Sequence, residues 1–186
     1  MAQLIGYALV NTCITTPLID EAHRLLQQLR QAGQLGSDVR VALNSQLCLA
    51  VAYRGRGLMP GLVAQLSQQL APRYEALYAT VHRQNARSMR YHRREGYRQV
   101  AETPERVCFL RPITVDERPS ELLAGLRLRA ALPADAPALH TLNHAWARAT
   151  RGENLAEGFL TSVYSEAQFQ FIIAAGEIAV AETIAP

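Results

Sequence analysis

The sequence predicts one α/β domain, and two observations lead to that prediction. Short segments rich in strand-forming residues alternate with segments whose leucines recur at helical spacing. This alternation is typical of helices packed on a sheet with some parallel pairing. The 186 residues fit one ordinary domain, and the hydrophobic fraction of 49% is enough to fill its core.

The first 112 residues carry the clearest pattern. From Leu58 the leucines recur at 62, 66 and 70, once per helical turn, and Pro60 falls in the first turn, where its missing N–H costs nothing. Thr16 and Gly33 are residue types that begin and end helices. We therefore expect strands at 4–11, 39–53 (with 46–53 the buried part), 76–82, 97–102 and 106–112, and helices at 16–33, 58–70 and 85–96.

Residues 113–125 are charged, contain a proline and a glycine and lack a sustained period, so we expect a linker there. Beyond it, Asp135 is predicted to cap a helix whose Leu139, Leu142, Trp146 and Ala149 line one face. Ser165 and Gln168 form a predicted capping box. The expected elements are a strand at 126–131, helices at 136–149 and 166–176, and a strand at 177–182. The chain thus divides into 1–112, the linker 113–125 and 126–186, which together form one domain.

Composition excludes several classes of protein. No run approaches the roughly 18 consecutive apolar residues of a membrane helix, and the first residues lack the basic region of a signal peptide. We therefore expect a cytoplasmic protein with no membrane partner. Cys13, Cys48 and Cys108 are odd in number and far apart in apolar surroundings, so we expect buried, reduced thiols rather than a disulfide framework or a metal site.

All 19 basic residues are arginine, and the net charge is +3. Guanidinium groups suit phosphate recognition, but whole-chain charge alone does not identify a ligand.

Residues 46–66, QLCLAVAYRGRGLMPGLVAQL, run from an apolar segment through the turn 54–57 into the leucine-spaced helix. Two glycines let backbone N–H groups converge, and the helix N-terminus behind them adds partial positive charge, so the turn can hold a pyrophosphate. No Gly-Lys-Ser/Thr follows, as a Walker loop requires, and a Rossmann fingerprint would need a third glycine and a later acidic residue. Taken alone, the segment could equally be a tight turn that exposes two arginines.

A second motif follows in the next predicted strand and helix. Asn85, Ser88 and His92 have near-helical spacing, and Gly96 and Tyr97 come directly after that helix. With both motifs present, the chain resembles the GNAT superfamily of acyl-CoA-dependent N-acyltransferases. The glycine motif of that family, Arg/Gln-x-x-Gly-x-Gly/Ala, is similar to Arg54-Gly55-Arg56-Gly57-Leu58-Met59, with Met59 where a small residue is usual.

The resemblance implies a GNAT-like fold, a mixed and mostly antiparallel twisted sheet in which a central pair of parallel strands splays apart, flanked by helices. Residues 46–53 and 76–82 would be the splayed strands, with the acyl-pantetheine arm inserted between them. The implied activity is acyl-CoA-dependent N-acyl transfer, most often of acetyl from acetyl-CoA to a primary amine, by direct attack in a ternary complex. The co-substrate would be acetyl-CoA, no metal would be needed, and the acceptor would be a small-molecule or peptide amine.

The resemblance also assigns residues to CoA. Backbone groups near 49–51 would pair with the pantetheine and polarise the thioester carbonyl. The N–H groups of 54–59 would hold the pyrophosphate, and Asn85 would contact the pantetheine amide region. The implied CoA-binding residues are Leu49, Ala50, Val51, Arg54, Gly55, Arg56, Gly57, Leu58, Met59, Asn85 and Ser88.

Three residues are candidates for catalysis. His92 lies where the family usually has a tyrosine that protonates the leaving thiolate, and histidine can hold and release a proton near neutral pH. Tyr91 is the competing donor, although one residue along a helix faces about 100° away. His82, at the end of the second splayed strand, is a candidate base or the start of a water relay. Each has a structural alternative, with His92 packed on its helix and His82 facing solvent.

Glu153, Glu157 and Tyr164 lie in the region where family members place acceptor-binding loops, and any of them could be an ordinary surface residue. The sequence does not name the acceptor.

Arg87, Arg90 and Arg94 share one helical face, which could be a solvated rim, a clamp for the 3′-phosphate of CoA or a nucleic-acid stripe. Few aromatics accompany them, so we expect no nucleic-acid partner. Two alternatives to an enzyme therefore stay open, namely a catalytically inactive GNAT-like module that binds CoA or a partner and, more remotely, a basic nucleic-acid-binding protein.

The order of the elements differs from that of the family. In the family about half of the domain precedes the glycine turn, whereas here residues 126–182 resemble that half and follow the turn. In family order, "GEIAVAETIAP" would run into "MAQLIGYALV" as a hairpin, so the chain resembles a circularly permuted GNAT domain. The linker could span about 40 Å, enough to close the domain within one chain. It could instead deliver 126–186 to a second molecule in a segment-swapped homodimer.

Overall fold

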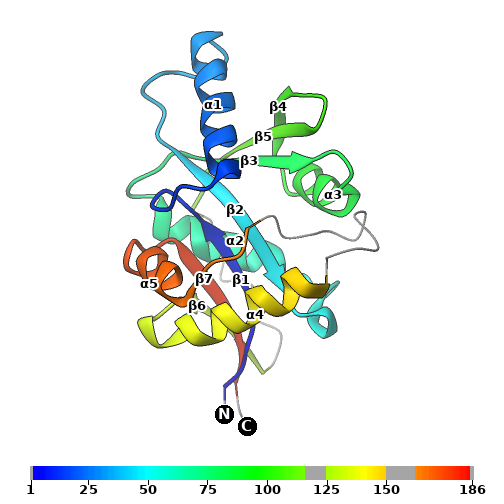
Figure 1. Ribbon diagram of the computed structural model, residues 1–186, viewed down its shortest axis with the longest axis vertical. Coiled ribbons are helices and arrows are strands. Elements are labelled where there is room, and N and C mark those ends of the chain that lie inside the picture. Colours follow the sequence, from blue (N-terminus) through cyan, green and yellow to red (C-terminus); the bar gives the residue numbers. More distant parts are fainter. Residues whose placement is uncertain (1, 116–124, 150–161, 185–186) are drawn as a thin grey trace.

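The computed structural model describes residues 2–115, 125–149 and 162–184, and its strands form one sheet in the order β4-β5-β3-β2-β1-β7-β6 (Figure 1). The strands are β1 (Leu4–Val10), β2 (Val41–Leu49), β3 (Ala76–His82), β4 (Arg98–Glu102), β5 (Arg106–Pro112), β6 (Leu126–Ala130) and β7 (Ile178–Thr183). The helices are α1 (Pro17–Gln31), α2 (Leu58–Leu70), α3 (Ala86–Arg94), α4 (Ala136–Ala149) and α5 (Glu166–Ala174), with short 3₁₀ helices η1 (Val51–Tyr53) and η2 (Pro133–Asp135).

Among the described strands, β2 and β3 are the parallel neighbours and every other pair is antiparallel. Their pairing runs only from Val41 beside Ala76 to Leu43 beside Tyr78. Beyond that point β2 continues along β1 and β3 continues along β5, so the two strands separate toward their C-terminal ends. The predicted fold class, a mixed and mostly antiparallel sheet with a splayed parallel pair between helices, is confirmed.

Helices cover both faces of the sheet (Figure 1). The leucines at 58, 62, 66 and 70 of α2 are all buried, and they pack with Met89 of α3 against one face. The other face is covered by α4 and α5 over β1 and β7, and by α1 over β2, β3 and β5. Because alternate residues of a strand point to opposite faces, Ala8 lies under α2 while Tyr7 and Leu9 lie under α4 and α5.

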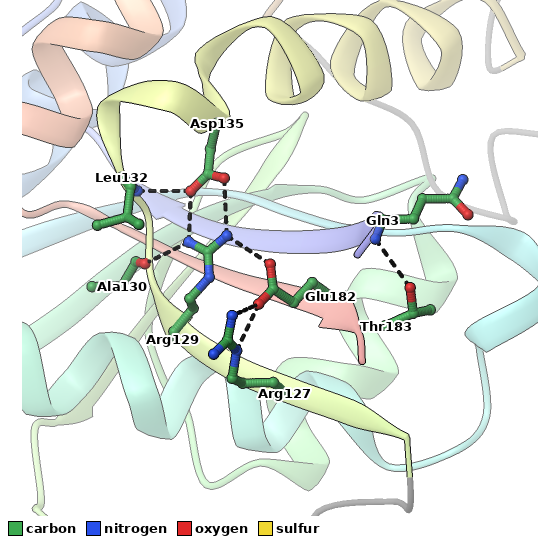
Figure 2. Close-up of polar contacts among 8 residues, drawn as sticks. All are labelled: Gln3, Arg127, Arg129, Ala130, Leu132, Asp135, Glu182 and Thr183. Atoms are coloured by element: carbon green, nitrogen blue, oxygen red, sulfur yellow. Dashed lines mark hydrogen bonds and ion pairs between the residues drawn. The ribbon is translucent and has the colours of Figure 1, made fainter. Parts of the chain in front are cut away.

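The segment that contains β6 and β7 is attached to the edge of β1. β7 pairs antiparallel with β1, and the N–H of Gln3 donates to Oγ1 of Thr183 at 3.0 Å (Figure 2). The buried carboxylate of Glu182 accepts from Arg127 and from Arg129, and Arg129 also donates to Asp135 at 2.6 and 2.9 Å. A buried carboxylate without partners would be strongly destabilising, so these arginines are needed where β6 lies beside β7.

Most predicted helix ends are confirmed. Thr16 caps α1 by accepting the N–H of Ile19, and Ser165 forms the predicted capping box with Gln168 at the start of α5. Gly96, just after α3, has φ +78°, the left-handed conformation that glycine adopts without strain.

The second predicted strand is wrong at its end. β2 stops at Leu49 rather than at Tyr53, and the next residues form η1, where Val51 is 70% exposed. The N–H of Tyr53 donates to the carbonyl of Ala50 at 2.9 Å, and Nε of Arg54 donates to the carbonyl of Leu49 at 3.0 Å. An apolar run alone does not distinguish a strand from a turn, and these local hydrogen bonds select the turn.

Two smaller predictions are also wrong. Asp135 does not begin α4, because it lies in η2, where its carboxylate accepts the N–H of Leu132 at 2.7 Å and pairs with Arg129. Cys13 is exposed, whereas Cys48 and Cys108 are buried as expected, and all three thiols are free. The exposure of Cys13 arises because β1 ends at Val10 and the chain turns before α1.

Candidate functional site

A cavity of about 820 Å³ lies where β2 and β3 separate. On the face of α2 and α3 it is lined by strand residues such as Leu49 and Val81, whose side chains belong to the core under those helices. On the opposite face it is lined by Gln46, Thr80 and His82. The cavity therefore passes through the sheet and is open to groups from both helical layers.

One edge of the cavity is the side of β2 that faces away from β1, where the carbonyl of Leu49 already accepts from Nε of Arg54. The N–H of Ala50 donates to the carbonyl of Ile5 in β1 at 2.7 Å. Because peptide groups alternate in direction along a strand, the N–H and C=O groups of Leu47 and Leu49 point away from β1, into the gap left by β3. An extended chain of amides could pair there like an added strand. Of the residues predicted at the thioester, Leu49 lines the cavity, whereas Ala50 is directed to β1 and Val51 is exposed in η1.

The glycine turn lies at one end of the cavity. Gly55 and Gly57 have φ +75° and +74°, a left-handed conformation that side chains other than glycine rarely adopt. Gly57 is the N-cap of α2, and no side chain of the described residues caps this helix end. The N–H groups of Leu58 and Met59 are therefore left for an anion, with the helix dipole in support. Both residues line the cavity, and Arg56 does not.

Arg54 joins this turn to the other part of the chain. In addition to its bond to Leu49, its guanidinium carbon lies 3.6 Å from the ring centroid of Trp146 in α4, a close cation–π contact. Both residues line the cavity. The side chain of Arg54 thus holds the turn in place.

The three arginines predicted to share a face of α3, Arg87, Arg90 and Arg94, all line the cavity. Arg90 and Arg94 are exposed and Arg87 is half-buried, so they form a basic rim beside the α2 N-terminus.

Tyr91 and His92 both line the cavity, although neighbours on a helix face different directions. The hydroxyl of Tyr91 and Nε2 of His92 are buried and have no hydrogen-bond partner among the described residues. His92 is only 4% exposed and its ring stacks on Phe109 at 5.3 Å. Leaving a buried polar atom unpaired costs free energy, which a ligand that reached these two atoms would offset.

Tyr91 and His92 are both uncharged at neutral pH, but they differ in whether the unpaired atom carries a hydrogen. Burial lowers the pKa of His92 to about 4, so its ring is neutral at neutral pH. Nδ1 lies 2.8 Å from the carbonyl of Ser88 and therefore carries the hydrogen, which leaves Nε2 as an acceptor. Burial raises the pKa of Tyr91, so its hydroxyl keeps its proton. Of the two unpaired atoms, only the hydroxyl of Tyr91 carries a proton.

The predicted ligands Asn85 and Ser88 lie at the start of α3 and line the cavity. Oδ1 of Asn85 accepts the N–H of Ser88 at 3.0 Å, so this oxygen caps the helix. The first role of Asn85 is therefore to hold α3 beside the end of β3.

His82 ends β3 and lines the cavity on the α1 face. Its Nδ1 accepts the N–H of Gln84 at 3.2 Å, so in the neutral ring the hydrogen is on Nε2. In this tautomer Nε2 is a donor, and a role as base requires the Gln84 contact to break first.

The three residues that the sequence suggested for the acceptor region do not form one group in the structure. Tyr164 is 1% exposed and its hydroxyl accepts from Asn11 at 3.1 Å, so it belongs to the core and does not line the cavity. Glu153 and Glu157 lie outside the described residues.

Sequence reasoning missed several residues of the cavity. Asn44, Gln46, Arg106 and Trp146 line it, yet none belongs to a recognisable motif. Gln46 is held by Tyr7, whose hydroxyl donates to its Oε1 at 2.8 Å. The three consecutive polar residues 44–46 between the apolar ends of β2 were a local signal that could have indicated this site.

Among the described residues, no helix is long and apolar enough to cross a membrane, and no group of three or more His, Cys, Asp or Glu side chains could hold a metal ion.

No protein-family model and no curated protein sequence matches this chain. Among solved structures, it is similar to a Desulfovibrio desulfuricans protein described as a GNAT-family acetyltransferase, with 15% identity and TM-score 0.38 over 43% of this chain and 57% of that one. It is also similar to yncA of Salmonella typhimurium, described as an acetyltransferase with its cofactor acetyl-CoA (16%, TM-score 0.40, 63% of each chain). A third is a GNAT family acetyltransferase from Elizabethkingia anophelis with acetyl-CoA bound (9%, TM-score 0.36, 58% and 97%). The matches leave more than a third of the first two proteins uncovered.

Proposed function

We propose that this chain is an acyl-CoA-dependent N-acyltransferase that transfers an acetyl group from acetyl-CoA to a primary amine by direct attack in a ternary complex. The observation that carries the proposal is the cavity that passes through the sheet between β2 and β3. A donor bound on the α2 and α3 face and an acceptor bound on the α1 face would meet inside this gap, which lowers the entropic cost of bringing them together.

The residues of the α2 face suit the donor. Acetyl-CoA supplies an activated thioester. The N–H groups of Leu58 and Met59 would bind its pyrophosphate, and the arginine rim of α3 would pair with its remaining phosphate. The N–H of Leu49 would hydrogen-bond the thioester carbonyl, where negative charge develops during attack.

We assign the acid role to Tyr91. A tyrosine hydroxyl carries its proton at neutral pH and would give it to the thiolate that leaves, whereas His92 is neutral and offers Nε2 only as a hydrogen-bond acceptor. This proposal moves the acid role from His92, where the motif alone placed it, to its neighbour.

We also infer that the element order is a circular permutation of the GNAT order. β7 lies beside β1 and antiparallel to it, as two strands joined by a hairpin would lie. In the chain, however, β6, α4, α5 and β7 follow the glycine turn instead of preceding it.

The function is tested by two measurements on the purified chain. Saturating CoA, at about 100 times its Kd, stabilises a protein by about 2.7 kcal/mol, which for a chain of this size corresponds to roughly 5 to 10 °C in Tm. With acetyl-CoA and a panel of primary amines, we expect free thiol to be released. A thermal shift without thiol release would identify a binding module instead. No response to CoA, together with nucleic-acid affinity that falls steeply with salt, would identify a nucleic-acid-binding protein.

The glycine turn gives a more local prediction. Gly57→Ala is expected to lower the free energy of unfolding by roughly 1 to 2 kcal/mol, because alanine is strained at φ +74°, and also to weaken CoA binding by displacing the α2 N-terminus. A Cβ at Gly57 meets no atom within 4 Å, so the effect comes from the backbone. Urea unfolding and the CoA-dependent thermal shift measure the two effects.

Gly33→Ala is the matched control, because Gly33 has φ +68°, equally open space and a position at the end of α1. It should lose similar stability and keep its response to CoA. Equal CoA responses in the two variants would contradict the role of Gly57.

A further inference from the structure

The side chains on the α1 face of the cavity indicate which kind of acceptor could bind there. Any assignment of an acceptor rests on the proposed function. From this face the cavity is lined by Ile19, Ala22, Leu43, Ser45, Gln46, Thr80, His82 and Arg106. Most members of this described set are polar, and none is a carboxylate. Glu95, the acidic residue that does line the cavity, lies at the end of α3 and pairs with Arg94 at 2.8 Å.

Arg106 is the charged group of this face. Its side chain is 12% exposed, and its Nε donates to Glu21 of α1 at 2.8 Å. Among the described residues its guanidinium makes no other hydrogen bond, so Nη1 and Nη2 keep their donors for another group. A guanidinium held through Nε presents these two nitrogens side by side, the arrangement that binds a carboxylate with two parallel hydrogen bonds.

His82 lies directly opposite Arg106 in the β3–β5 pairing. Side chains at such positions have Cβ atoms about 5 Å apart, so one small molecule can contact both. Because Nδ1 of His82 accepts from Gln84, the hydrogen of the ring is on Nε2. Both members of this pair are therefore hydrogen-bond donors, which suit an anion and repel an ammonium group.

We propose that the acceptor is an amino acid or similar small amino carboxylate, whose carboxylate binds Arg106 while its amine reaches the gap between β2 and β3. The basic rim on α3 opposes acceptors with several positive charges, such as polyamines, and no carboxylate is among the described residues that line the cavity from the α1 side to attract them. Specificity for the acceptor then arises from its carboxylate, which takes no part in the acyl transfer.

The experiment compares each of the common amino acids with its own carboxamide as acceptor, with acetyl-CoA as donor and thiol release as readout. The two members of a pair share shape and amine, and differ in the charge that Arg106 binds. We expect kcat/KM to favour the amino acid roughly 10- to 100-fold, the range for a lost charge-assisted hydrogen bond. Arg106→Gln should remove that preference by raising KM for the amino acid, with little change for the carboxamide.

Three variants accompany Arg106→Gln. Arg98→Gln, at an exposed position on β4, is the matched control and should keep the preference. Arg106→Lys keeps the charge and should restore part of it. Glu21→Gln removes the partner on Nε and should leave the preference in place, so a loss there too would mean that the ion pair only supports the fold.

The proposed acceptor is tested first by whether the unaltered chain prefers amino acids to their carboxamides. Equal rates for amino acids and carboxamides would overturn the proposed acceptor, and so would an unchanged preference for amino acids in Arg106→Gln. Thiol release with amines that have no carboxyl group would still support the proposed acyltransferase function. If no member of the panel is acetylated, titration calorimetry with the CoA-loaded protein replaces turnover. Amino acids that bind no better than their carboxamides would then overturn the proposal. A normal CoA-dependent thermal shift in each variant shows that it is folded.

Discussion

Tyr91→Phe is expected to lower kcat for acetyl transfer by roughly 10²- to 10⁴-fold, the range for loss of a general acid. The variant removes only a hydroxyl that is buried, keeps its proton and has no partner among the described residues. Removing a buried unpaired hydroxyl does not destabilise a fold, so Tm should stay the same or rise. Thiol release at saturating acetyl-CoA and amine measures kcat, and the CoA-dependent thermal shift shows that donor binding persists.

Tyr74→Phe is the matched control for this substitution. Its hydroxyl contacts Oγ1 of Thr12 at 3.4 Å and Tyr74 does not line the cavity, so its kcat should be that of the unaltered chain. Full activity in Tyr91→Phe, combined with loss of activity in His92→Gln, would return the acid role to His92.

The second large effect concerns stability in acid. In the unfolded chain His92 binds a proton below its ordinary pKa of 6.5, whereas in the folded chain burial lowers that pKa to about 4. Between these values the unfolded state holds the extra proton, so stability falls as pH falls. The contribution of His92 is fully present above pH 6.5 and is lost below about pH 4, with a total change of about 3 kcal/mol.

His92→Gln isolates this contribution. Urea unfolding of both proteins across the same pH range gives two slopes, and the titration of all other groups cancels in their difference. The difference in free energy of unfolding should shrink by about 3 kcal/mol from neutral pH to pH 4. Parallel curves would mean that the ring of His92 is accessible to water and its pKa ordinary.

The elements that the sequence predicted well are those specified by neighbouring residues. The leucines of α2, the capping box of Ser165 and the left-handed glycines depend on contacts within one or two turns of the chain. Such contacts can be recognised from the order of the residues alone. The separation of β2 from β3 also followed from a local motif, through its resemblance to a known family. The predictions failed where a nearby polar contact redirected the chain, as Arg54 does at Leu49 and Arg129 does at Asp135.

The candidate site was predicted in part for the same reason. The turn at 54–57 and the start of α3 are contiguous motifs, and the structure brings both to one cavity. Tyr164 shows the opposite case, because it is buried in the core and its hydroxyl accepts from Asn11, which is 153 residues away in the chain. A local sequence pattern cannot predict a contact between residues so far apart in the chain.

The sequence by itself determined a glycine turn, the helix behind it and a second polar helix, because backbone conformation and helix periodicity are local properties. Only the tertiary structure decided that the cavity crosses the sheet, that Tyr91 and not Nε2 of His92 presents a proton, and that Arg106 lies opposite His82. Those three facts depend on burial and on partners from distant segments, such as Glu21 beside Arg106. Burial sets pKa values and leaves hydrogen-bonding groups for a ligand, and it exists only once the chain has folded.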